Sequence, residues 1–408
     1  MELRMGSFNL SSLPCMENLF EDTSVDVSVE VGDAAEVAEE TTEATEVATD
    51  VQEDTAEASD TETTTELIFQ HIDTLINRKM YLETYGYDRR FAMLASQDGV
   101  DYIQGGAPAV ESVNDVSSVN DSYTIAALEG VGEALKSAWE WIKKVLGKIA
   151  NWVGRFFRSV VMMFSSLENN IMRLKKLLSN STWDTERAEK ASGDVPESKK
   201  DMEDAMNKAI ADNANNNGGG IAANSWTGIS KDLTTHFATI GKYALNDMGD
   251  QHDVTDTNTM HDIGSTNVML NNKDNLKKFR DATRKIGEDL KKVADKKTSI
   301  SNVKSGSVSD WLSLATEICN SKTSLKNLGD AAAKNVGTAK KQAEKLSMLK
   351  SNNGSVSSAV SKKFRAITNV LSNLQSFSAK FCGSLVKIAN WLVKGAAKVL
   401  GACYKKNK

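Results

Sequence analysis

Two long stretches of the chain place apolar residues at steps of three and four, the spacing of one face of an α-helix. In the first, residues 124–180, these positions are Ala138, Ile142, Val145, Ile149, Trp152, Phe156, Val160, Met163, Leu167 and Ile171. The second, residues 357–408, repeats at 387–391 the pentapeptide KIANW that first occurs at 148–152. Both stretches predict long amphipathic helices. We expect Trp152 and Trp391 to lie on or beside apolar faces that are buried within the protein or against an assembly partner.

The remaining segments are shorter or more polar. Residues 66–97 predict a small helical hairpin that turns at Gly86, and residues 98–123, rich in Gly, Ser, Asn and Asp, predict a linker. Residues 181–356 predict a polar helical region with loops. The chain has only three prolines, so little interrupts helical hydrogen bonding. The predicted fold class is all-α: a helical hairpin plus long amphipathic helices in a loose bundle with a thin core.

Charge divides the chain into two opposite parts. Residues 21–66 hold 17 acidic side chains and no basic one. The net charge of −6 is therefore made of −18 on residues 1–66, −5 on 67–129 and +17 on 130–408. An acidic segment with few apolar residues repels itself and buries too little surface to fold. We expect residues 1–65 to form a disordered acidic leader.

The basic residues of the first amphipathic stretch gather on the side opposite its apolar face. These candidates for contacts with a nucleic-acid backbone are Lys143, Lys144, Lys148, Arg155 and Arg158. Three interpretations remain open for such helices. Their apolar faces pack within the chain, they bind a membrane surface, or their basic faces bind nucleic-acid phosphates while the apolar faces pack inside.

Motifs of catalysis are missing from the sequence. It contains no P-loop, dinucleotide-binding glycine fingerprint, HExxH or GxSxG motif, and its four cysteines show no CxxC spacing. His252 and His261 share one polar segment with Asp250 and Asp256, but their spacing matches no common metal site. We predict no enzyme activity, no cofactor and no metal. Neither a signal peptide nor a membrane-spanning helix is expected.

One combination of segments is similar to a known family. The acidic leader is followed by a segment containing LETYGYDRRFAMLA and then by EALKSAWEWIKKVLGKIANWVGRFF. This order resembles the internal head (prohead core) proteins of large tailed bacteriophages. The resemblance implies a structural protein of the virion interior that passes through the host cytoplasm before assembly. Its implied partners are prohead core and capsid proteins, a head maturation protease and the packaged double-stranded DNA.

The same resemblance implies cleavage after Glu in a small-or-aliphatic–X–Glu motif. Two matches lie near the boundary where the charge changes sign, Ala109-Val110-Glu111 and Ala127-Leu128-Glu129. Glu111 and Glu129 are therefore the candidate cleavage positions, and cleavage would leave a basic body next to DNA. The alternative function is a membrane-associated or membrane-active helical protein.

Overall fold

The structure is a computed structural model that describes residues 65, 67–88, 90–93, 121–214, 221–245, 273–347 and 358–407. Within them the chain is helical apart from strands of three residues each, which confirms the all-α class. The helices are residues 67–85 and 90–93, α3 (Asp121–Ser179), α4 (Thr185–Lys190), α5 (Lys199–Ala214), α6 (Ile229–Leu245), α8 (Lys273–Val293), α9 (Ser307–Asn320), α10 (Lys322–Ser347) and α11 (Ser358–Cys403), with 3₁₀ turns Trp226–Gly228 and Ile300–Asn302. The strands are β1 (Ser181–Trp183), β2 (Asp194–Pro196), β3 (Lys297–Ser299) and β4 (Tyr404–Lys406).

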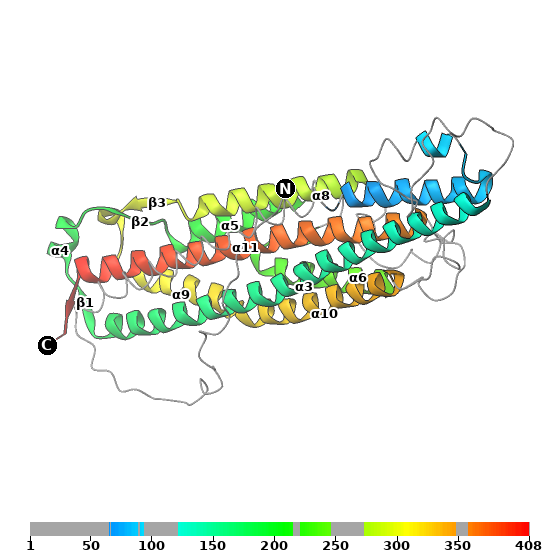
Figure 1. Cartoon of the computed structure of the whole chain (residues 1–408). Coiled ribbons are helices and arrows are strands. Elements are labelled where there is room, and N and C mark those ends of the chain that lie inside the picture. The colour runs from blue at the N-terminus through cyan, green and yellow to red at the C-terminus, as the bar shows by residue number, and fades with distance from the viewer. Residues whose placement is uncertain are drawn as a thin grey trace, which may run out of the picture.

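The helices form an elongated bundle around α11 (Figure 1). α11 contacts α3, α6, α8 and α9, α10 contacts α3 and α6, and α5 covers α8. α3 has 59 residues, so at 1.5 Å per residue it is about 90 Å long. The stretches expected at 124–180 and 357–408 thus correspond to the two longest helices of the described chain.

α11 is buried around most of its circumference. Phe364, Phe381 and Leu385 have almost no exposed surface, and among the described residues of α11 only Lys398 and Gly401 are exposed. Its small polar residues, such as Ser378, are buried too. A helix that is apolar or small on all sides serves as the core of its neighbours. The sequence predicted an amphipathic basic helix here. In the structure, basic residues of α11 reach solvent only along one narrow side of the helix.

Residues 67–93 belong to the same core as the rest of the bundle. Phe69 packs edge-on against Trp139 of α3, and Trp139 packs edge-on against Phe364 of α11, with ring centroids 6.4 and 5.4 Å apart. Asp73 accepts hydrogen bonds from Ser361 (2.7 Å) and Arg365 (3.4 Å). The helical elements expected at 66–97 are present, but they are an integral part of the bundle. One continuous apolar core runs from this segment to the C-terminal end of α11, which makes the core larger than the thin one we expected.

Two short antiparallel ribbons close the left end of the bundle in Figure 1. β1 pairs with β4, and β2 pairs with β3. Two tryptophans attach the β2–β3 ribbon to the helices. The indole N–H of Trp391 in α11 donates to the Lys296 carbonyl oxygen (2.9 Å), and that of Trp311 in α9 donates to the Glu197 carbonyl oxygen (2.8 Å). Trp152 of α3 is buried, so both KIANW tryptophans lie on or beside buried faces, as expected.

Candidate nucleic-acid interface

The exposed side of α3 carries four of the five basic residues chosen from the sequence. Lys144, Lys148, Arg155 and Arg158 are exposed, and we call these four the α3 basic face. The opposite side of the helix is held in the core by residues such as Trp152 and Phe156, whose rings stack at 4.6 Å. Packing of the apolar side therefore fixes the basic side toward solvent.

The exposed part of α3 lacks negative charge over most of its length. From Lys144 to Ser179 the only acidic residue is Glu168, which is half-buried and paired with Lys322 of α10. Arg173 and Lys176 extend the exposed cations toward the end of the helix. The result is a strip of positive charge that continues beyond the α3 basic face and exposes no carboxylate.

Lys143, the fifth candidate, is used differently. Its ammonium lies 2.6 Å from Glu140 and 3.9 Å from Glu344 of α10. The hydrogen bond to Glu140 is the main reason that the pKa of Lys143 is raised. Because its charge is already paired, Lys143 connects α3 to α10 and offers less to a phosphate than its four neighbours. The helical pattern of the sequence placed Lys143 and Lys144 on the same basic side and did not separate them.

One cation next to this face comes from a distant part of the sequence. The side chain of exposed Lys340 in α10 lies over Gly147, and a Cβ added to Gly147 would be 3.6 Å from the Lys340 Cε atom. Sequence periodicity gave no sign of this proximity, because it depends on the antiparallel packing of α10 against α3. Charge density near Lys144 and Lys148 is therefore higher than the pattern of α3 alone indicates.

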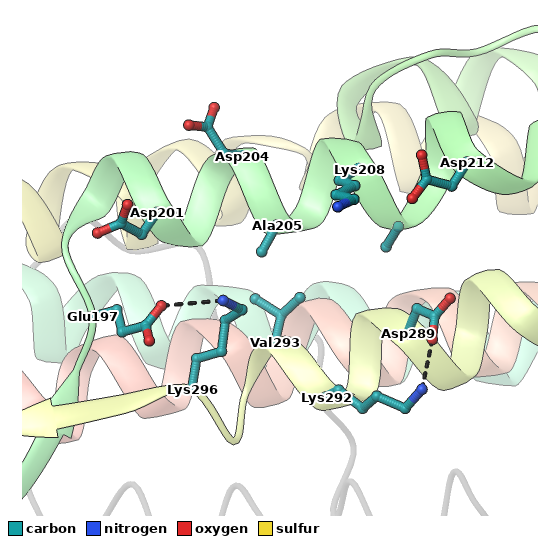
Figure 2. A pocket seen from close by; sticks show the side chains of 11 residues that line it. Glu197, Asp201, Asp204, Ala205, Lys208, Asp212, Asp289, Lys292, Val293 and Lys296 are labelled. Atoms are coloured by element: carbon teal, nitrogen blue, oxygen red, sulfur yellow. Dashed lines mark hydrogen bonds and ion pairs between the residues drawn. The ribbon is translucent and has the colours of Figure 1, made fainter.

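An open groove between α5 and α8, of about 680 Å³, contains a mixture of charges (Figure 2). Several of them pair with one another: Lys296 lies 3.2 Å from Glu197, and Lys292 lies 2.7 Å from Asp289. No group of acidic, His or Cys side chains suited to a metal ion occurs in the described ranges. The segment with His252 and His261 lies outside those ranges.

The cysteines in the described helices are buried thiols. Cys319, Cys382 and Cys403 are all reduced. Burial raises the pKa of Cys319 to about 12, and burial likewise raises the pKa values of Cys382 and Cys403. A thiol must ionise to act as a nucleophile. These three therefore behave as small apolar residues of the core.

The two candidate cleavage positions are in different situations. Glu111 lies outside the described residues. Glu129 is exposed but stands within α3, and Ala127 two residues before it is fully buried. Because a protease reads an extended segment, cleavage after Glu129 would require the first turns of α3 to unwind and Ala127 to leave the core.

Comparison of the chain with protein-family models, with curated proteins and with solved structures gave no match.

In the parts of the chain that the structure describes, no helix has the length and apolar character needed to cross a membrane. The apolar faces of α3 and α11 pack in one core. Binding of these faces to a membrane surface would require the two helices to separate.

Proposed function

We propose that this chain is a non-catalytic structural protein of the phage head interior, assembled with the prohead core, whose folded body contacts packaged double-stranded DNA. Its other partners would be capsid proteins and a head maturation protease. The observation that carries the DNA contact is the α3 basic face, which is exposed and continues to Ser179 without an exposed carboxylate. The phage assignment rests on the resemblance of the sequence, and the charge distribution supports it.

A strip of cations binds duplex DNA mainly by releasing counterions from phosphates. Such binding does not depend on base sequence, and it weakens steeply with salt, with a log–log slope of about −0.9 per phosphate contacted. A protein packed among long stretches of DNA needs no sequence preference. The acidic leader, with 17 carboxylates on residues 21–66, would limit this binding before assembly by competing for the same cations.

The DNA contact is tested with a matched pair of variants of the full-length chain. One changes the α3 basic face to Gln at all four positions. The control removes the same number of charges from exposed lysines on other helices: Lys190, Lys200, Lys208 and Lys231. Binding to duplexes of unrelated sequence is followed by fluorescence anisotropy over a range of salt concentrations.

We expect the α3 variant to bind more weakly and with a flatter salt slope, whereas the control stays close to wild type. If both variants lose the same amount of duplex affinity, the loss is due to net charge alone, which contradicts a specific role for α3. Vesicles of neutral and anionic lipid serve as a second ligand. Tight vesicle binding without DNA binding would favour the membrane alternative.

The phage assignment is tested on the protein in its native particle. The mass and N-terminal residue of the protein recovered from purified virions would show whether it is packaged and whether it is shortened. We expect recovery from the head fraction with a new N-terminus after a Glu in the region before the basic body. Absence of the protein from purified virions would overturn the assignment.

A further inference from the structure

α11 reaches solvent along one narrow line, and from Lys380 onward the charged residues on that line are all lysines. Lys380, Lys387, Lys394 and Lys398 recur at steps of seven and four, on the side of the helix that other elements leave partly open. We call them the α11 lysine row. α11 contains no Asp or Glu. The rest of the helix is buried, so its limited exposed surface is used mainly to present positive charge.

α8 lies alongside this row and adds a lysine to it. A Cβ added to Gly287 of α8 would lie 2.9 Å from the Lys380 Cβ atom, which shows how closely the two helices approach. The pKa of Lys387 is lowered, first by burial and then by the positive charge of nearby Lys291, while Asp295 acts in the opposite direction. The cations of the two helices therefore form one cluster along the α8–α11 seam.

Some cations of α8 are paired and others are not. Arg284 lies 3.1 Å from Glu288, and Lys292 lies 2.7 Å from Asp289. Lys291 is exposed and forms no ion pair with the described residues. The like charges of Lys291 and Lys387 repel one another, and a bound polyanion would relieve this repulsion.

The length of the row suits a nucleic-acid backbone. From Lys380 to Lys398 the helix rises about 27 Å, and duplex DNA presents one negative charge per about 1.7 Å of its axis. A straight row of lysines of this length can meet several phosphates in any register. A small anionic ligand would use only one or two of the lysines.

The row is separate from the α3 basic face. α11 packs between α3 and α8, and α8 makes its main contacts with α11 and α5. In Figure 1, α8 follows the upper edge of the bundle, whereas α3 descends to the lower edge at the left end. Removal of charge from one surface therefore leaves the cations of the other in place.

We propose that the α11 lysine row, together with Lys291 of α8, is a second contact surface for the phosphodiester backbone of double-stranded nucleic acid. This inference rests on the proposed function and adds to it a site on a different pair of helices. A chain with two such surfaces contacts more phosphates than the α3 basic face alone could reach.

The test uses the full-length chain and a row variant with Lys291→Glu, Lys387→Gln and Lys394→Gln, a change of four charges. Lys380 and Lys398 are left unchanged because Lys380 packs over Gly287 and Lys398 donates to the Asp194 carbonyl oxygen. The same three positions changed to Arg keep the charge. A second variant, Lys291→Glu with Lys394→Glu, gives the same change of four charges and leaves the partly buried Lys387 unchanged.

Binding of a duplex is measured against salt for the row variants, the α3 variant and the control variant described above. We expect each row variant with reduced charge to flatten the log–log salt slope by about 0.9 for every phosphate that it no longer neutralises. The Arg variant should bind like wild type, and combining the row and α3 variants should add their effects. If the row variants bind duplex DNA as the control variant does while the α3 variant binds it more weakly, this inference is overturned and the proposed function still stands. Failure of the wild-type chain to bind duplex DNA at low salt would overturn both.

Discussion

The pentapeptide KIANW occurs twice, and its two copies have different surroundings. In α3, Asn151 is exposed and Trp152 is buried. In α11, Asn390 is buried and Trp391 is half-buried, with its indole N–H bonded to the Lys296 carbonyl oxygen. Identical residues are thus used on a surface helix and on a central one. The difference comes from the helices packed around each copy, which a local pattern does not specify.

Asn390 provides a test of this difference. Neither the oxygen nor the nitrogen of its buried side-chain amide has a hydrogen-bond partner among the described residues. A buried polar group without a partner costs about 1–3 kcal/mol. We expect Asn390→Leu, whose side chain has the same branching and the same number of heavy atoms, to raise the free energy of unfolding by up to that amount, and Asn151→Leu to change it little. Urea unfolding measures both; a decrease in stability at position 390 would contradict this expectation.

At the scale of elements, two glycines of α10 differ sharply in their surroundings. A Cβ added to Gly329 would lie 2.6 Å from the Cβ of Phe157 in α3, whereas one added to Gly337 meets nothing within 4 Å. Gly329 therefore allows α10 to approach α3 closely at this point. That approach supports the pairing of the two helices next to the α3 basic face.

We expect Gly329→Ala to lower the free energy of unfolding by about 1–3 kcal/mol, because overpacking forces the helices apart. Gly337→Ala in the same helix should raise it by about 0.5–1 kcal/mol, because alanine restricts the unfolded chain and favours helix. Thermal or urea unfolding of the two variants gives the comparison. If both substitutions change the free energy of unfolding in the same direction, the close packing of Gly329 against Phe157 is contradicted.

A charged cluster links α5 to α9 and gives the stability of the fold a dependence on pH. Lys199 lies 2.6 Å from Glu317, and this hydrogen bond holds the pKa of Glu317 below its ordinary value of 4.5. The ionised carboxylate therefore stabilises the fold above the unfolded pKa, and this contribution disappears as the pH falls through the lower folded pKa. Burial is the main reason that the pKa of nearby Glu203 is raised, so ionisation of Glu203 destabilises the fold.

We expect Glu317→Gln to be less stable than wild type at neutral pH, and the difference to vanish on acidification, when Glu317 itself becomes neutral. Exposed Glu189 of α4 provides a control, and Glu189→Gln should show little difference at any pH. Urea unfolding at a series of pH values is the measurement. A difference that persists at acid pH would assign the effect to packing of the side chain.

The elements themselves followed closely from the sequence, whereas their arrangement did not. Steps of three and four located α3 and α11, and the scarcity of proline indicated an all-α fold. The central position of α11 was missed because its Ser, Asn and Gly residues appear polar in a pattern but are small enough to pack inside. The pairing of Lys143 with Glu344 and the position of Lys340 over Gly147 join residues about two hundred positions apart. Periodicity carries no information on such contacts.

At the scale of the whole molecule, either candidate cut would change how the N-terminal helix is held. Cleavage after Glu111 or Glu129 would leave residues 67–93 attached to the body only through contacts such as Phe69 with Trp139 and Asp73 with Arg365. Cleavage after Glu129 would also divide α3. A change in DNA binding is therefore measured more cleanly when only the acidic leader is released.

We expect release of the leader to strengthen duplex binding. A site for a specific protease placed at residues 61–64, and cut after the chain has folded, would remove most of the 17 carboxylates of residues 21–66. The cut protein should bind more tightly than the uncut protein at low salt, and the difference should shrink as salt screens the leader. Anisotropy titrations before and after cutting measure it, with a chain that lacks the inserted site as the control. Equal affinities would contradict competition by the leader.

The central position of α11 also affects how the chain comes to be folded during its synthesis. The helix that α3, α6, α8 and α9 all contact comes after every one of them in the sequence, so it leaves the ribosome later than they do. Domains generally fold as units, with N-terminal parts first during translation, but here the earlier helices lack their shared partner until α11 has emerged. Until then the parts of their apolar faces that α11 covers stay exposed. A chain that stops before Ser358 would therefore lack the common packing surface of the bundle and would be a target for aggregation or degradation.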